Sequence, residues 1–258
     1  MCELLGISAS NPIYCNKILK DFFSHSVKHP HGWGLATHNE NNIFIEKEPV
    51  PAYKSTYLKY RLKDKIYSDI VLAHIRYATI GNIDYNNCHP FTLTDKVGRR
   101  WTLIHNGTIF DFPKFEEYID EQKGETDSER IIMYIIHKVN EGIDKKADAL
   151  DEKERFNVIS TVFSEIAKGN KVNLLLYDGD LLYVHTNYKN TLFYSEEEGD
   201  KIFATTPLND DHSWYPVPFC KALAYKYGDL VYSGEDHKNE YVDKPENDKY
   251  LYGVFSSL

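Results

Sequence analysis

The sequence predicts an α+β protein in which stacked β-sheets are covered by helices. Three observations support this fold class. Apolar runs typical of buried strands open the chain and recur along it, segments with apolar residues at helical spacing lie between them, and strands return after the two longest helical segments. Because no internal repeat or Gly/Ser-rich linker divides the sequence, we expect a single domain over residues 1–258, with a polar C-terminal tail from about residue 234.

The first half of the chain is predicted to contain one helix among several strands. An apolar run over residues 3–8 predicts a buried first strand that begins beside Cys2. Apolar residues at helical spacing predict an amphipathic helix over residues 15–27, which Pro30 and the glycines after it end. Further strands are predicted at residues 35–37, 43–46, 70–77 and 101–105.

The second half begins with two predicted helices. Thr126 and Glu129 fit a capping box that starts the first helix, and the charged stretch over residues 144–155 starts the second. Strands are then predicted at residues 172–177, 181–185, 202–205, 222–227 and 230–232, the first two being joined by a tight turn at Asp178-Gly179. Residues 233–249 are expected to form an exposed tail that docks again through residues 250–255.

Composition and charge exclude several classes of function. No stretch approaches the ~20 apolar residues of a membrane span, and the N-terminus lacks signal peptide features, so we expect a cytoplasmic protein without a membrane partner. The formal net charge of -9 argues against a nucleic-acid partner. The four cysteines form no CxxC pair, and the histidines, including His25, His29 and His31, form no HExxH pattern. We therefore expect no metal and no cofactor.

Cys2 is the most unusual residue, because a small side chain at position 2 is compatible with removal of Met1. Removal would place a free α-amino group on the same residue as the thiol. The pKa of an α-amine is about 7.7 to 8.0, so the amine can act as a base for the thiol near neutral pH. The alternative is an ordinary packed cysteine at a chain end.

Three further polar positions are candidates for a site. Arg76 lies in an otherwise apolar strand and should meet a carboxylate, which could belong to the protein or to a ligand. Asn106-Gly107 could form an oxyanion hole or a tight turn, for which Asn-Gly is the commonest dipeptide. Asp127 lies in the first turn of a predicted helix, where its charge could simply stabilise the helix N-terminus.

Taken together, these motifs resemble those of class II glutamine amidotransferases in their order and approximate spacing. The resemblance is strong over roughly the first half of the chain and continues weakly through residues 173–179 and 205–208. It is closest to the stand-alone branch, which includes proteins similar to the amidotransferase-like subunit of a glutathione-degrading complex. The matching motifs are Cys2-Glu3-Leu4-Leu5-Gly6, His31-Gly32-Trp33-Gly34, Arg76-Tyr77-Ala78-Thr79, His89-Pro90, His105-Asn106-Gly107 and Thr126-Asp127-Ser128-Glu129.

The resemblance implies the fold of an N-terminal-nucleophile hydrolase, a four-layer αββα sandwich of two antiparallel sheets. It implies that the Cys2 sulfur attacks the γ-carboxamide of glutamine or a γ-glutamyl compound and forms a thioester. Asn106 and Gly107 would stabilise the oxyanion, at ~3 to 4 kcal/mol for each donor. Arg76 would hold the α-carboxylate of the substrate and Asp127 its α-ammonium group.

The resemblance also places Thr79 and His89 at the border of the substrate pocket. The branch that makes amino sugars carries tryptophan after the arginine and a histidine in the next loop, whereas this chain has Tyr77 and Ile80, which argues against a sugar-phosphate substrate. Because the chain ends soon after the amidase-like part, transfer of ammonia would need a separate partner protein. Two alternatives stay open, namely a hydrolase of γ-glutamyl peptides and a non-catalytic partner subunit with the same fold.

Overall fold

The computed structural model describes residues 2–39, 42–208, 213–245 and 247, which form two antiparallel sheets and their covering helices. One sheet contains β1 (Glu3–Tyr14), β2 (Trp33–Asn39), β3 (Asn42–Glu48), β4 (Tyr67–Ile75), β9 (Phe193–Glu197), β10 (Asp200–Ala204) and β11 (Tyr215–Pro216). The other contains β5 (Phe91–Thr94), β6 (Arg100–Thr108), β7 (Lys171–Tyr177), β8 (Leu182–Thr186), β12 (Leu223–Lys226) and β13 (Asp229–Ser233). The α-helices are α1 (Asn16–Ser24), α2 (Thr56–Arg61), α3 (Asp127–Lys146) and α4 (Glu152–Ala167).

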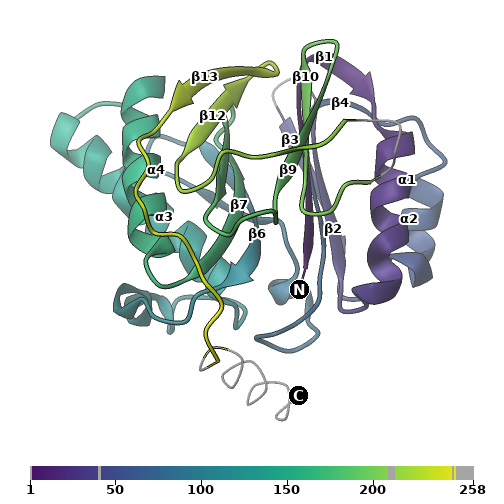
Figure 1. The fold of residues 1–258 in the computed structure, drawn as a ribbon, viewed down its shortest axis with the longest axis horizontal. Helices are drawn as coiled ribbons and strands as arrows, with labels where there is room; N and C mark the ends of the chain where they lie inside the picture. The colour runs from purple at the N-terminus through teal and green to yellow at the C-terminus, as the bar shows by residue number, and fades with distance from the viewer. Residues whose placement is uncertain (1, 40–41, 209–212, 246, 248–258) are drawn as a thin grey trace.

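The two sheets stack face to face, and each carries helices on its outer face (Figure 1). The strand order is β11-β9-β10-β1-β4-β2-β3 in the seven-stranded sheet and β13-β12-β8-β7-β6-β5 in the six-stranded sheet. Helices α1 and α2 cover the first sheet, and α3 and α4 cover the second. This arrangement confirms the predicted α+β class and the four-layer sandwich.

Alternate residues of β1 face two different apolar layers, which explains why this strand reads as a continuous apolar run. Leu4 belongs to the layer between the sheets, where it joins residues such as Ile104 and Leu175. Leu5 and Ile7 belong to the layer under α1 and α2. Each of these side chains is fully buried and stabilises the fold by roughly 1.5 to 3 kcal/mol. The strand that follows Cys2 is therefore held from both faces.

Several predicted boundaries are wrong for local reasons. The first strand continues to Tyr14, with an irregularity after Ser8, and α1 ends at Ser24 before a short 3₁₀ helix. The second long helix begins within the charged stretch over residues 144–155 as predicted, but later than its first residues, because α3 runs on to Lys146. Helix α4 begins at Glu152, behind a capping box that Asp151 forms with Glu154.

Several short elements escaped prediction. Helix α2 and strands β5, β9 and β11 have six residues or fewer, too few for a clear period. The predicted docking segment 250–255 lies outside the described residues. Within the described part of the chain, no helix combines the length and the apolar character required to cross a bilayer.

Candidate functional site

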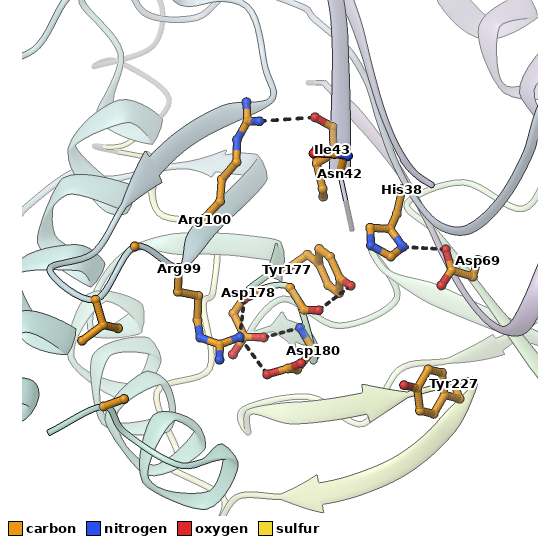
Figure 2. A pocket seen from close by; sticks show the side chains of 14 residues that line it. His38, Asn42, Ile43, Asp69, Arg99, Arg100, Tyr177, Asp178, Asp180 and Tyr227 are labelled. Atoms are coloured by element: carbon orange, nitrogen blue, oxygen red, sulfur yellow. Dashed lines mark hydrogen bonds and ion pairs between the residues drawn. The ribbon is translucent and has the colours of Figure 1, made fainter. Parts of the chain in front are cut away.

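Two of the cavities in the described structure lie at opposite ends of the strands, and only one of these two is lined by a cysteine. The larger, of about 720 Å³, opens where β4 and β6 begin (Figure 2). Its charged side chains are largely paired, with His38 Nδ1 2.8 Å from Asp69 Oδ1 and the Arg99 guanidinium 2.7 Å from Asp180 Oδ2. Its described lining includes no cysteine, serine or threonine. This chemistry does not favour covalent catalysis there.

The smaller cavity, of about 40 Å³, lies where β6 ends and β1 begins. Four residues predicted from the sequence line it together, although they come from distant parts of the chain: Cys2, Thr79, Asn106 and Gly107. The remaining lining residues are Tyr77, Thr108, Phe110, Lys171, Tyr241 and Asp243. A thiol, an amide side chain and a glycine backbone therefore border one small space between the sheets.

The Cys2 thiol is positioned by the chain that leaves the end of β4. β1 pairs with β4 so that Glu3 lies opposite Ile75, and this register brings Cys2 beside Tyr77. The Tyr77 N–H points at Cys2 Sγ across 3.3 Å, and Sγ lies 3.4 Å from the Tyr77 carbonyl oxygen. Desolvation raises the pKa of the thiol, while the contact with the Tyr77 backbone and the charge of Arg76 lower it in part. The net rise favours the protonated thiol, so a nucleophilic Cys2 needs a base.

Asn106 and Gly107 lie within β6 and are not in a turn, so the turn interpretation is wrong. They pair with Asn173 and Val172 of β7. A Cβ atom at position 107 would lie 1.9 Å from the carbonyl oxygen of Lys171 and 2.6 Å from His105 Nε2. Glycine is required here by close packing of neighbouring backbone, which also leaves the backbone beside the cavity uncovered.

Arg76 is buried, with an exposed fraction of 3%, and its guanidinium contacts carbonyl groups rather than the expected carboxylate. It donates to the carbonyl oxygens of Asn82 at 2.8 Å, Ile80 at 2.9 Å and Gly81 at 3.0 Å. The guanidinium therefore organises the loop that follows Thr79. Arg76 does not line the small cavity.

Asp127 begins α3 and is held in place by neighbouring donors. Its Oδ2 accepts the N–H of Ile109 at 2.8 Å, and the Ser128 hydroxyl lies 3.4 Å from its Oδ1. The Ser128 hydroxyl in turn lies 2.9 Å from His105 Nδ1. The capping prediction holds in part, since Thr126 Oγ1 accepts the N–H of Glu129 at 3.3 Å. Asp127 borders the end of β6 but is not among the cavity-lining residues.

His89 is buried and is not among the residues that line the small cavity. Its ring centroid is 4.0 Å from that of His74 and 4.8 Å from that of Phe91. Burial lowers the pKa of His89 and of His74 well below the usual range, and the nearby charge of Arg76 lowers both further. Burial also lowers the pKa of His105. These three rings are thus neutral at physiological pH, and in this structure His89 contributes packing.

Glu3, the residue after Cys2, contacts two histidines, His25 and His29. Its carboxylate lies 2.8 Å from His25 Nδ1 and 3.0 Å from His29 Nε2. Burial opposes ionisation of Glu3, but hydrogen bonds from His29 and His25 outweigh it, so the pKa of Glu3 is lowered. In the described part of the chain, no three histidine, cysteine, aspartate or glutamate side chains group as metal ligands would.

We expect Glu3→Gln to destabilise the protein at neutral pH but much less in acid. The carboxyl has a lower pKa in the folded state than the ordinary value of 4.5, so its stabilising effect is complete above that pH. The effect disappears as the pH falls through the lowered pKa that Glu3 has in the folded state. Below that pH the carboxyl of wild-type Glu3 is protonated and is uncharged, like glutamine. Urea unfolding of both proteins between about pH 6 and pH 3 measures this. A stability difference that does not change with pH would contradict the assignment.

Three of the residues that line the small cavity were not identified from the sequence. Lys171 is the first residue of β7, and Tyr241 and Asp243 come from the segment that was expected to be an exposed tail. Tyr241 is only 6% exposed, so the tail interpretation is wrong at this residue. Its only sequence signal is an aromatic residue within a charged stretch, and that carries no periodicity.

Comparisons with known proteins agree with this geometry. A family model described as "Glutamine amidotransferases class-II" matches residues 1–198. YafJ of Escherichia coli K12, whose name assigns it provisionally to the glutamine amidotransferases, is 32% identical over 243 residues, covering 84% of this chain and 94% of YafJ. The protein MJ1515 of Methanocaldococcus jannaschii is 28% identical over 264 residues, covering 91% of this chain and 72% of MJ1515.

Solved structures support the fold independently of these sequences. The glutamine phosphoribosylpyrophosphate amidotransferase of B. subtilis superimposes with a TM-score of 0.67 at 17% identity, covering 92% of this chain and 49% of that enzyme. A Pseudomonas aeruginosa structure described as that of a "predicted glutamine amidotransferase" gives a TM-score of 0.63 at 21% identity, covering 90% of this chain and all of that one. At these identities the likeness shows a shared fold.

Proposed function

This chain belongs to the class II glutamine amidotransferase family, and we propose that it releases ammonia from glutamine with Cys2 as the nucleophile. The observation that carries the proposal is the meeting of Cys2 with Asn106 and Gly107 in one cavity. The thiol comes from the start of β1 in one sheet, and the amide and glycine come from the end of β6 in the other. A nucleophile and two donors for an oxyanion are the parts that acyl transfer needs.

In the proposed first half-reaction, Cys2 Sγ forms a bond to the γ-carboxamide carbon of glutamine. The thiol proton passes to the Cys2 α-amine, freed by loss of Met1, either directly or through a water molecule. The amine is suited to this because desolvation raises the pKa of the thiol, which then does not ionise unaided. Asn106 Nδ2 and the Gly107 N–H would stabilise the oxyanion, and ammonia leaves with the transferred proton.

In the proposed second half-reaction, water attacks the thioester carbon and glutamate leaves. The amine accepts a proton from the water and returns one to the sulfur, so the thiol is restored. Arg76 would hold the α-carboxylate of the substrate by exchanging its carbonyl partners for an anionic acceptor. A carboxylate carries a full negative charge and can accept two parallel N–H bonds from a guanidinium, which a carbonyl group cannot, and this favours the exchange. Asp127 would hold the α-ammonium group, and Thr79 would border the bound substrate.

Mass spectrometry after incubation with a glutamine-mimicking diazoketone tests the proposal directly. We expect an intact mass without Met1, and a single adduct that peptide mapping assigns to Cys2. Excess glutamine should slow the labelling, because it competes for the same pocket. A chain that retains Met1 and gains no adduct would overturn the catalytic role. It would leave the family membership intact and favour a non-catalytic subunit.

A further inference from the structure

The cavity beside Cys2 is too small for an amino-acid substrate. Its volume of about 40 Å³ corresponds to about three or four water molecules, since one water needs roughly 10 to 15 Å³ measured in this way. Some part of the wall therefore has to move before glutamine can reach the thiol. The structure indicates which part can do so at the lowest cost.

Four of the ten residues that line the cavity belong to paired strands, which cannot shift singly. Asn106, Gly107 and Thr108 belong to β6, and Lys171 begins β7; each of these positions is fixed in the ladder between the two strands. Displacing them would break several backbone hydrogen bonds at once. Two other lining residues, Tyr241 and Asp243, belong to a segment far along the chain that we call the strap and define as residues 237–243. The strap has no helix or strand structure.

The strap is held in two parts. Its first residues are fixed by contacts of His237 with His185, of Asn239 with Asn187 and Ser164, and of Glu240 with Lys189, whereas the part over the cavity is held largely through Tyr241. The Tyr241 ring stacks on Phe110, with centroids 5.9 Å apart and planes 9° apart, and meets Tyr188 edge-on at 5.5 Å. The Tyr241 N–H donates to the carbonyl oxygen of Asn187 at 2.7 Å, and the Tyr188 hydroxyl donates to Asp243. Between these two anchors, Val242 is 64% exposed and points away from the wall.

We propose that Tyr241 and Asp243 determine specificity by closing the strap over Cys2, so that molecules reach the thiol according to their size. The larger the molecule, the further the strap has to lift and the more completely the two aromatic contacts of Tyr241 have to break. This inference rests on the proposed function only in taking Cys2 as the reacting group. It assigns a role to a segment that lies beyond residues 1–198, where the family model matches.

The size of the effect follows from the contacts that are lost. Each aromatic pair of this geometry shifts an opening equilibrium by about two- to twelvefold. Removing the Tyr241 ring should therefore increase opening of the strap by about fivefold or more. Asp243→Asn weakens the second anchor by replacing a charged acceptor with a neutral one, so a smaller change in the same direction is expected.

The test uses two thiol reagents with the same reactive group, iodoacetamide and the bulkier iodoacetanilide, on the full-length protein. Modification of Cys2 is followed by peptide mass spectrometry, so that Cys15, Cys88 and Cys220 do not contribute. In Tyr241→Ala we expect the rate with iodoacetanilide to rise about fivefold or more relative to the rate with iodoacetamide. Tyr241→Phe keeps the ring and should behave like wild type, as should Val242→Ala, the matched control within the strap.

Each outcome either supports or overturns the role of the strap in controlling access to Cys2. Unchanged rates with both reagents in Tyr241→Ala, or equal increases with both, would overturn the proposal, because the strap would then not discriminate by size. A selective increase in Asp243→Asn provides independent support, since that variant retains the aromatic contacts. The readout does not depend on catalysis. Suppose that Cys2 of Tyr241→Ala reacts faster only with iodoacetanilide, while neither wild type nor any variant hydrolyses glutamine. The strap inference then stands and the proposed function fails.

Discussion

Replacing Cys2 with alanine is expected to reduce glutamate release from glutamine by a factor on the order of 10⁶, which is the scale of losing a covalent nucleophile. The proposed oxyanion donors, Asn106 and Gly107, would remain but would have no tetrahedral intermediate to stabilise. Without the thiol, the α-amine has no proton to accept from a reacting group. Glutaminase activity measured as glutamate formed per minute should fall to the background of the assay.

The fold should survive this change, because Cys2 lies ahead of β1 and is only half-buried. Thermal unfolding and circular dichroism should match wild type closely. Cys15→Ala is the matched control, since Cys15 is another free thiol, buried under α1 and distant from the cavity lining. It should retain activity at temperatures where it stays folded. Activity that persists in Cys2→Ala, or disappears equally in Cys15→Ala, would contradict Cys2 as the nucleophile.

Periodic segments of the sequence were predicted well, because their burial repeats along the chain. The helix begun at Thr126 and the apolar strand over residues 172–177 both exist, since each presents a regular apolar face to the core. Elements such as β5 and β9 depend on pairing with neighbouring strands, β6 and β10. Their few residues carry no period, so local sequence could not reveal them.

The candidate site also combines residues that local motifs identify with residues that only the folded chain brings together. Cys2, Asn106 and Gly107 belong to recognisable motifs, and all three line one cavity. Asn106-Gly107 reads locally as a turn, yet the approach of the Lys171 carbonyl from β7 requires glycine inside a strand. Tyr241 lies in a polar stretch and becomes part of the wall only because the folded chain brings it against Phe110. No local pattern encodes such a contact.

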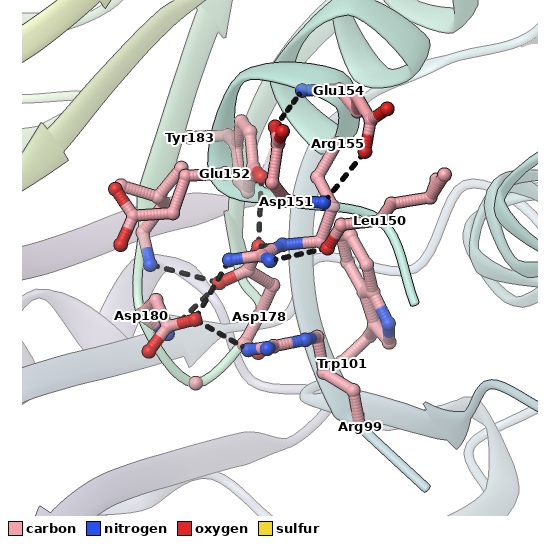
Figure 3. A network of polar contacts seen from close by, with 12 residues as sticks. Arg99, Trp101, Leu150, Asp151, Glu152, Glu154, Arg155, Asp178, Asp180 and Tyr183 are labelled. Carbon is pink, nitrogen blue, oxygen red and sulfur yellow. Dashed lines mark hydrogen bonds and ion pairs between the residues drawn. The ribbon is translucent and has the colours of Figure 1, made fainter. Parts of the chain in front are cut away.

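Replacing Arg155 with methionine is expected to give the largest loss of stability. Arg155 lies in the first turns of α4, where its Nε lies 2.7 Å from Asp178 Oδ2 and its Nη2 2.7 Å from Asp180 Oδ2 (Figure 3). Asp178 has no exposed surface, and Arg155 is 3% exposed. Removing one partner of a buried ion pair costs about 3 to 5 kcal/mol, because the remaining charge stays desolvated.

Other donors to Asp178 reduce this cost without abolishing it. Asp178 Oδ1 accepts the N–H groups of Asp180 at 2.9 Å and Leu181 at 2.8 Å, and its Oδ2 accepts the Tyr183 hydroxyl at 2.8 Å. Burial and the charge of Asp178 raise the pKa of Tyr183, so the hydroxyl remains a donor. These neutral donors orient the carboxylate but supply no positive charge. We therefore expect a loss near the lower end of the range.

Urea and thermal unfolding measure the effect, and a loss of about 3 kcal/mol lowers Tm by about 6 to 12 °C in a chain of this size. Lys153→Met is the matched control, because it removes the same charge from an exposed position on α4 and should change stability by less than about 1 kcal/mol. The double variant Arg155→Met with Asp178→Asn should recover part of the loss, since no unpaired charge then remains buried. Equal stability of the single and double variants would show that the loss comes from packing of the arginine stem.

Activity measurements should distinguish the Arg155 ion-pair network from the Cys2 cavity. Asp178 and Asp180 line the large cavity at the far end of the strands, whereas Cys2 lies at the other end. Arg155→Met should therefore lower the temperature at which glutaminase activity is lost while leaving kcat near that of wild type at temperatures where the variant is folded. A large fall in kcat at those temperatures would mean that the ion-pair network and the Cys2 cavity are energetically coupled through the β6 and β7 strands that connect them.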